Sequence, residues 1–374
     1  MKVMVALGTR PEVIKLAPVI AALRGRVDLV ICSTGQHREM LSQALEAFGI
    51  CPTISLDTMS PGQSLNVLSS RILFQMDEVL VQERPDWILV QGDTTTALCC
   101  GLAAFHLGIQ IGHVEAGLRT GDLANPFPEE ANRTLLTRIA TRHFAPTGLA
   151  RDCLLSEGIK RQDVVVTGNT VVDAIVQAKK AVQQLDPSIP DVIRTLSDAK
   201  PIVLVTCHRR ENFGGMIDGI CNMLKGLCAR YPDRQWVFPV HLNPAVQEPV
   251  LRLLGDIPNL LLLPPVSYQT SLYLISRSQL IVSDSGGIQE EAPYFGVPVV
   301  VMRTHTERRE GIDAGFATLA GQSVERIAQA VIHWLDHPEQ GASLKNRANP
   351  YGDGHAAERI VASLLGEEFQ EFHG

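Results

Sequence analysis

Two acidic residues, Asp93 and Glu115, each end a short apolar run of the chain. A strand–helix–strand pattern separates the two runs, so we expect both carboxylates at the carboxyl ends of parallel strands, as neighbours about 5 Å apart. Two carboxylates at that distance repel, which raises the pKa of one of them and suits it to proton transfer near neutral pH. Asp93 could instead cap the helix that follows it, because threonines and apolar residues come next.

A third acidic position, Glu129, stands with Glu130 at the start of a predicted helix that also carries Arg133. Carboxylates in the first turn of a helix complement its dipole, so an ordinary structural role is open for both. Three acidic positions in one region nevertheless favour a site for acid–base chemistry.

The turn at Gly8, Thr9 and Arg10 follows the first apolar run and opens the first predicted helix. A helix N-terminus favours negative charge, and Arg10 and Lys15 place cations nearby, so the turn could bind a phosphate. A surface turn with two solvated charges explains the same residues. The pattern GxGxxG is missing at this turn, and GxxxxGK(S/T) is missing from the chain, which argues against NAD-linked dehydrogenases and P-loop NTPases.

A stronger phosphate signal lies at Ser285, Gly286 and Gly287, between a strand-like run and a helical pattern. The glycines let backbone N–H groups come close to an oxyanion. Glu291 follows one helical turn later, where it could accept hydrogen bonds from ribose hydroxyls, and Arg308 adds a cation after the next strand. A plain turn that requires glycine is the alternative.

Two histidines end strand-like runs in the second half of the chain. His208 could donate a proton or contact a phosphate, or it could lie on a solvated surface turn. His241 ends the following run in the same manner and could equally be a structural histidine.

The elements that must position these residues alternate between short apolar runs and longer amphipathic stretches. Unbroken runs of Val, Ile and Leu that are spaced by helical patterns are typical of parallel strands buried on both faces. We expect helices at residues 11–23, 62–82 and 95–107, and strands at residues 3–7, 29–33, 87–90, 109–114, 164–166, 202–206, 235–240, 260–263, 280–283 and 297–301.

The length of 374 residues corresponds to roughly two and a half domains of ~150 residues. The proline-containing stretch 183–200 lacks a clear apolar period and marks a linker, and we expect a first domain over residues 1–170 and a second over 171–354. Both should be doubly wound α/β domains, with a cleft between them where the carboxyl ends of the strands face each other. Apolar spacing predicts a closing helix over residues 355–372.

Hydrophobic residues make up 45% and charged residues 20% of the chain, which indicates a packed globular protein. The net charge of −7 argues against a nucleic-acid partner. No apolar run reaches the ~18 residues of a membrane span, and no secretory signal follows Met1, so we expect no membrane partner. Eight cysteines without a CxxC pair indicate reduced, buried thiols in a cytoplasmic protein, with neither disulfides nor a metal site.

Taken together, these segments resemble the non-hydrolysing UDP-N-acetylglucosamine (UDP-GlcNAc) 2-epimerases of bacteria and archaea. The resemblance covers nearly the whole chain and rests on ten segments in the same order: GTRPEVIKLAPV, TGQHREML, QGDTTTAL, HVEAGLRTGDL, PFPEEANR, VTGNTVVDA, CHRRENFG, PVHLNP, DSGGIQEEAP and THTERRE. It implies two Rossmann-like domains in the GT-B arrangement with UDP in the cleft, a final helix that crosses back to the N-terminal domain, and a homodimer. Enzymes of this family eliminate UDP to give 2-acetamidoglucal and add it back to yield UDP-N-acetylmannosamine (UDP-ManNAc), without a cofactor.

The resemblance also implies roles for residues that match the motifs of the family. Asp93, Glu115 and Glu129 match its acid–base carboxylates, and His208 matches a histidine that supports the departure of UDP. The substrate-binding residues that it implies are Arg10, Lys15, Arg133, His241, Ser285, Gly286, Gly287, Glu291 and Arg308. The chain departs from the family at Gln91, where many members have histidine.

The sequence therefore predicts a cytoplasmic, cofactor-free UDP-GlcNAc 2-epimerase that serves polysaccharide biosynthesis. Two other enzymes stay open: a hydrolysing epimerase that releases ManNAc and UDP, and an epimerase for a modified UDP-HexNAc. A GT-B glycosyltransferase would share the fold and the UDP site but leave the configuration at C2 untouched. A non-catalytic sugar-nucleotide sensor would bind UDP-GlcNAc without turnover.

Overall fold

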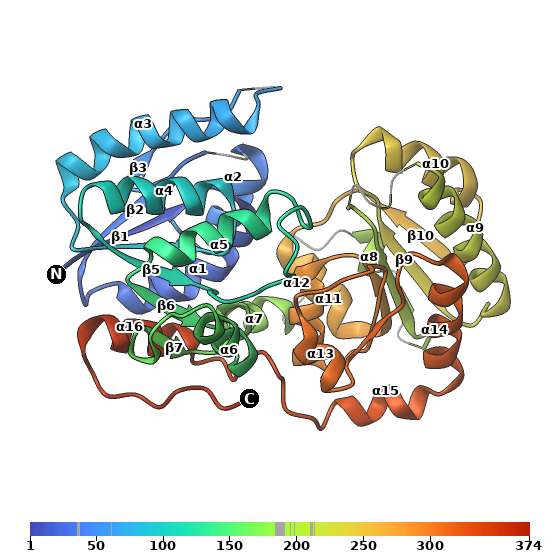
Figure 1. Ribbon diagram of the computed structural model, residues 1–374. Coiled ribbons are helices and arrows are strands. Elements are labelled where there is room, and N and C mark those ends of the chain that lie inside the picture. Colours follow the sequence, from blue (N-terminus) through green and yellow to red (C-terminus); the bar gives the residue numbers. More distant parts are fainter. Residues whose placement is uncertain are drawn as a thin grey trace. The chain divides into compact units, whose positions relative to one another are not determined.

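The computed structural model describes residues 1–35, 38–60, 62–183, 191–194, 196–197, 199–209, 212 and 214–374. Contacts within the chain divide it into two units (Figure 1): unit 1 comprises Met1–Gln177 and Tyr351–Gly374, and unit 2 comprises Ala178–Pro350. The boundaries expected from the sequence, after residues 170 and 354, lie a few residues away from these. The stretch 183–200, expected as the linker, follows the first boundary, and its residues 184–190 lie outside the described part of the chain.

Unit 1 is built on a sheet of seven parallel strands in the order β3-β2-β1-β4-β5-β6-β7. The strands are β1 (Lys2–Leu7), β2 (Asp28–Ser33), β3 (Ile54–Ser55), β4 (Trp87–Gln91), β5 (Gln110–Val114), β6 (Arg142–Ala145) and β7 (Val164–Val166). Successive residues of β1 face opposite sides, since Val3, Val5 and Leu7 join one core cluster whereas Met4 and Ala6 join another. Burial on both faces explains why the central strands could be predicted from unbroken apolar runs.

Helices cover both faces of this sheet, as expected for a doubly wound domain (Figure 1). The core cluster on one face includes residues of α1 (Arg10–Leu23), α2 (Arg38–Ala47) and α16 (Ala356–Leu365). The cluster on the other face includes residues of α3 (Leu65–Glu83), α4 (Thr95–His106) and α5 (Glu129–Ile139). Unit 1 also contains α6 (Gly148–Ser156), a short 3-10 helix (Arg161–Asp163) and α7 (Thr170–Gln183), whose last residues lie past the unit boundary.

Two strands of unit 1, β3 and β6, are missing from the prediction. β3 has only two residues, and β6 begins with Arg142 and His143, which break the apolar pattern. His143 is nevertheless buried beside His113 of β5, and burial lowers the pKa of His143 to about 4 and that of His113 to about 3. A neutral histidine, His143, therefore occupies a position of the sheet where hydropathy alone predicts no strand.

The closing helix expected over residues 355–372 is wrong beyond Leu365. Gly366 adopts a left-handed φ of 70° and ends α16, a conformation that favours glycine. The chain then continues without helix until the N–H of Phe372 donates to the carbonyl of Val166 at 2.9 Å. The apolar face of α16 packs in the core of unit 1.

The start of α16 is held by Asp173 of α7. Its Oδ1 accepts the backbone N–H of Ala357 at 2.8 Å, whereas the residue at the N-cap position, His355, makes no capping side-chain bond. Burial raises the pKa of Asp173 to about 6. A carboxylate from another helix thus satisfies a donor that a local cap usually satisfies.

Unit 2 is built on six parallel strands in the order β10-β9-β8-β11-β12-β13. The strands are β8 (Ile202–Thr206), β9 (Gln235–Pro239), β10 (Leu260–Leu263), β11 (Ser278–Ser283), β12 (Val299–Val301) and β13 (Ala317–Leu319), of which β13 was not predicted. The helices are α8 (Asp191–Arg194), α9 (Gly215–Arg230), α10 (Pro244–Leu254), α11 (Tyr268–Arg277), α12 (Gly286–Glu291), α13 (Arg309–Asp313), α14 (Val324–Asp336) and α15 (Pro338–Leu344), with a 3-10 turn at Ala292–Phe295. Trp236, Phe238 and Phe316 lie in its core.

All eight cysteines are free thiols. Six are buried, but Cys51 is exposed and Cys153 is partly exposed, so the expectation of buried thiols is wrong for these two. Within the described residues, none of the helices combines the length and the hydropathy that crossing a bilayer requires.

Candidate functional site

Glu115 lies directly after β5 with a positive φ of 66°, a region that residues other than glycine rarely adopt. Its carboxylate is almost fully buried and accepts hydrogen bonds from Lys15 Nζ at 2.7 and 2.6 Å. Gln91, the last residue of β4, donates a third hydrogen bond through Nε2. The carboxylate of Glu115 is therefore fixed in place by one cation and one amide.

Asp93 lies two residues after β4, and β4 pairs directly with β5, as predicted. Arg133 Nη2 contacts its carboxylate at 2.9 Å, and Asn132 Nδ2 donates to its carbonyl at 2.8 Å. The capping alternative is wrong, because Thr94 caps α4. The two carboxylates were also expected to repel each other. Each is instead paired with a cation of its own, which reduces that repulsion.

Glu129 and Glu130 open α5, and their surroundings differ. Glu130 is buried and accepts the N–H groups of Thr120 and Gly121 at 3.0 Å each, so it fixes the loop that follows β5. Glu129 is only partly buried and occupies the first turn of the helix. Of the two, Glu129 is the less buried residue, although its Oε2 atom is itself buried.

Glu12 is a fully buried residue of α1 to which the sequence assigned no role. Its carboxylate accepts the N–H groups of Gly8 at 2.9 Å and Thr9 at 2.7 Å, and the hydroxyl of Thr94 at 2.7 Å. Burial raises the pKa of Glu12 despite these donors. A protein carboxylate therefore takes the N–H groups of Gly8 and Thr9, and Lys15 binds Glu115. The spacing of Thr9 and Glu12, which forms a capping box, is the signal that could have shown this. The phosphate contact expected at this turn stays a prediction.

In unit 2, His208 follows β8 and Asp284 follows the adjacent strand β11. Asp284 is fully buried and accepts the N–H groups of His208 at 3.0 Å and Arg209 at 2.9 Å, as well as Asn212 Nδ2 at 2.9 Å. His208 Nδ1 lies 2.9 Å from Oδ1 of the same carboxylate. Burial alone would raise the pKa of Asp284, but these hydrogen bonds outweigh it and hold the pKa well below its usual range.

Arg308 lies against the turn that precedes α12, as the predicted phosphate site requires. A Cβ on Gly286 would lie 2.8 Å from Arg308 Cζ and would displace the guanidinium, whereas a Cβ on Gly287 would meet only ordinary contacts. Ser285 caps α12, and Arg308 Nε donates to the buried Glu290 at 2.8 Å. Arg308 also pairs with the buried Glu307, which in turn contacts Arg303.

The remaining predicted residues take less specific places. Arg10 is the first residue of α1 and is partly buried. Glu291 ends α12 and is buried. The ring of His241 lies 6.5 Å from that of His208, and its Nδ1 accepts the N–H of Asn243 at 3.1 Å. Burial and the neighbouring His208 lower the pKa of His241.

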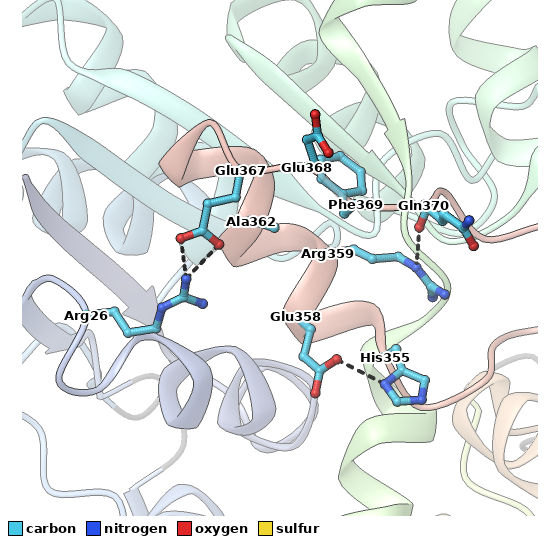
Figure 2. Close-up of a pocket in the computed structure, with 9 residues that line it drawn as sticks. All are labelled: Arg26, His355, Glu358, Arg359, Ala362, Glu367, Glu368, Phe369 and Gln370. Carbon is cyan, nitrogen blue, oxygen red and sulfur yellow. Dashed lines mark hydrogen bonds and ion pairs between the residues drawn. The ribbon is translucent and has the colours of Figure 1, made fainter.

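A surface hollow of about 600 Å³ lies beside α16 and contains none of the predicted site residues (Figure 2). Four of its ionisable groups form two pairs: Arg26 with Glu367 at 2.6 Å, and His355 with Glu358 at 3.0 Å. Arg359 donates to the carbonyl of Gln370 at 2.8 Å. The candidate functional residues therefore lie in two other sets, near the carboxyl ends of the strands. The unit 1 cluster consists of Lys15, Gln91, Asp93, Glu115, Glu129 and Arg133. The unit 2 cluster consists of His208, His241, Asp284, Ser285, Gly286, Gly287, Glu291 and Arg308.

Comparison with known proteins identifies the family of the chain that carries these clusters. The family model described as UDP-N-acetylglucosamine 2-epimerase matches residues 21–365. The chain belongs to this family. Within the 2-epimerase family, a curated relative from Yersinia pestis with that name is 46% identical over 369 residues, which cover 97% of this chain and 98% of the relative.

Two solved structures are also similar to this 2-epimerase family member. The crystal structure of UDP-GlcNAc 2-epimerase from Neisseria meningitidis bound to UDP-GlcNAc is 42% identical, has a TM-score of 0.94, and covers 98% of this chain and 100% of that one. An S. aureus structure, MnaA with UDP, is 40% identical with a TM-score of 0.92 and covers 100% of both chains. The predicted family and the predicted class of fold, with two parallel Rossmann-like sheets, are confirmed.

Proposed function

We propose that the protein is a UDP-GlcNAc 2-epimerase that interconverts UDP-GlcNAc and UDP-ManNAc. The observation that carries this proposal is the full-length similarity to the N. meningitidis enzyme, which is solved with UDP-GlcNAc bound. The unit 1 cluster adds carboxylates suited to proton transfer, and the unit 2 cluster adds a histidine and an arginine suited to a diphosphate.

The proposed route is an elimination followed by an addition, because the hydrogen on C2 of the sugar is not adjacent to a carbonyl and is too weakly acidic to be removed alone. A carboxylate takes the C2 proton, the C1=C2 double bond of 2-acetamidoglucal forms, and the C1–O bond breaks with its electron pair leaving on UDP. Re-addition of UDP with protonation of C2 from the other face gives UDP-ManNAc. The oxidation state of the sugar is the same before and after, so the reaction itself needs no redox cofactor.

Within this route we assign proton transfer to Asp93, Glu115 and Glu129 as a set. Lys15 and Gln91 hold the Glu115 carboxylate, and Arg133 holds that of Asp93. In unit 2 we assign the UDP moiety to residues of its cluster, with Ser285, Gly287 and Arg308 at the diphosphate, Glu291 at the ribose and His208 at the departing oxygen. Arg10 and His241 complete the proposed substrate contacts.

The test is to incubate the purified protein with UDP-GlcNAc in deuterated water and to follow the sugar by proton NMR. An equilibrium mixture of the two UDP-sugars with deuterium at C2 supports the proposal. Accumulation of free ManNAc and UDP would identify the hydrolysing reaction, and unchanged UDP-GlcNAc would contradict the proposal. Asp93→Asn, Glu115→Gln and Glu129→Gln should each lower turnover by about 10²–10⁴-fold, the contribution of positioned proton transfer.

We also propose a homodimer in the cytoplasm. The dimer is supported by apolar side chains that are exposed on three neighbouring helices: α4 packs against both α3 and α5. Phe74 of α3 is 70% exposed, and Phe105 of α4 and Leu135 of α5 are more than half exposed. Phe74→Glu should shift the mass measured by light scattering from dimer to monomer, while the control Phe369→Glu, beside α16, should not. The eight free cysteines support a reducing compartment.

A further inference from the structure

Asp284 and His208 form a buried-to-exposed pair in the unit 2 cluster. Asp284 is fully buried, whereas the side chain of His208 is 43% exposed, so a ligand can reach the histidine but not the aspartate. The two residues come from the ends of adjacent strands, 76 positions apart in the sequence. Their 2.9 Å contact joins Nδ1 of the ring to Oδ1 of the carboxylate.

This contact fixes which ring nitrogen of His208 carries a hydrogen. An ionised carboxylate only accepts hydrogen bonds. Asp284 stays ionised because it also accepts the N–H groups of His208 and Arg209 and the amide of Asn212. Nδ1 of His208 must therefore be the donor, and Nε2 is the ring nitrogen left for a ligand.

We infer that Asp284 is a positioning residue of the proposed epimerase, which orients His208 so that Nε2 contacts the departing diphosphate oxygen. The inference rests on the proposed function. When the C1–O bond breaks, its electron pair moves to that oxygen, and His208 with a proton on both ring nitrogens donates Nε2–H to the new charge while Nδ1–H stays on Asp284. A ring held through Nδ1 keeps this donor in place throughout the reaction.

Asp284 also holds the loop after β8, so a structural effect must be separated from an effect through His208. Arg209 binds the same turn twice, through its N–H to the carboxylate and through Nε to the carbonyl of Asp284 at 3.0 Å. If Asp284 acted only through this loop, its removal would lower activity whether or not His208 is present. If it acts through His208, its removal has no further effect once His208 is gone.

The first measurement reads the tautomer without any turnover. In protein labelled with ¹⁵N-histidine at pH 8, the His208 signal is assigned by its loss in His208→Gln, and long-range ¹H–¹⁵N spectra report which ring nitrogen is protonated. We expect a protonated Nδ1 in the wild-type protein and a protonated Nε2 with bare Nδ1 in Asp284→Asn. A bare Nδ1 in the wild-type protein would overturn the inference, even if Asp284→Asn does not fold.

The second measurement is a kinetic cycle of Asp284→Asn, His208→Gln and the double variant. We expect each single variant to lose about 10²-fold or more in kcat, and the double variant to lie within about threefold of His208→Gln. Losses that multiply in the double variant would contradict a role through His208. Thr206→Val is the matched control: it removes a bond of 2.7 Å to Ser283 between the same two strands and should leave kcat and the His208 signal unchanged.

The two measurements separate failure of this inference from failure of the proposed function. A wild-type protein that does not epimerise UDP-GlcNAc removes the proposed function, and the ring spectrum then still decides whether Asp284 orients His208. If the wild-type protein is active but Nδ1 of His208 is bare, or if the losses in kcat multiply in the double variant, only the role of Asp284 is refuted and the proposed function stands.

Discussion

Replacing Lys15 by methionine tests the ion pair that holds Glu115. The side chains are only 8% and 5% exposed, and Lys15 Nζ contacts both carboxylate oxygens. Removing one member of a buried ion pair costs about 3–5 kcal/mol, because the other charge stays buried without compensation. We expect the lower end, about 3 kcal/mol of unfolding free energy, since Gln91 still donates one hydrogen bond. Lys15→Met/Glu115→Gln should cost less than Lys15→Met alone, because it leaves no buried charge.

The assay is urea unfolding at pH 7.5, followed by the fluorescence of Trp87, which lies in β4 of unit 1. Replacing Trp236 and Trp334 of unit 2 by phenylalanine makes this signal specific. The matched control is Lys2→Met, since Lys2 contacts Glu83 at the same 2.6 Å distance but with side chains that are 26% and 22% exposed. The midpoint of this control should move far less than that of Lys15→Met. A double variant that costs the sum of both single changes, or a Lys15→Met protein as stable as the control, would refute the buried ion pair as the support of Glu115.

Two further predictions concern unit 2 and the start of α16. Gly286→Ala should destabilise the protein by about 1–3 kcal/mol, because its methyl group would lie 2.8 Å from Arg308 Cζ. Gly287→Ala should keep the wild-type melting temperature but weaken UDP binding about tenfold, or ~1.4 kcal/mol, in titration calorimetry; equal melting temperatures for the two variants would contradict this distinction. Asp173, whose pKa rises from 3.8 to about 6 in the folded protein, binds a proton more tightly when folded, so its stabilising contribution is full below pH 4 and is lost as the pH rises through 6. This loss is roughly 3 kcal/mol, and Asp173→Asn should flatten the difference in unfolding free energy between pH 4 and pH 7 by that order; an unchanged difference would show that Asp173 does not titrate in this range.

The sequence located the reactive residues that end apolar strands. Asp93 and Glu115 could be placed on neighbouring strands because a single helix separates two clearly apolar runs, and parallel topology then fixes the edge at which both lie. His208 and Ser285 follow strands of the same kind. Residues at strand ends can be predicted in this way because one local apolar pattern indicates both the buried strand and the point at which it ends.

The residues that the sequence missed act over longer distances. Glu12 accepts a hydrogen bond from Thr94, 82 positions away, and Asp284 accepts its bonds from residues around His208, 76 positions away. No local pattern reports which distant donors a buried carboxylate receives. For the same reason the expected repulsion between Asp93 and Glu115 overlooked their cations, because Lys15 is 100 positions from Glu115.

The return of α16 to unit 1 has a consequence for folding during translation. The core beside α1 includes residues of α16. The core of unit 1 therefore stays incomplete until the ribosome has added all of Ala178–Pro350 and the helix beyond it. At ~5–20 residues per second that intervening stretch takes roughly 10–35 s to make, during which the apolar groove for α16 stays open to solvent and to chaperones. A nascent chain stalled before residue 356 should therefore remain sensitive to proteases in the N-terminal body, and release of a longer chain should protect it.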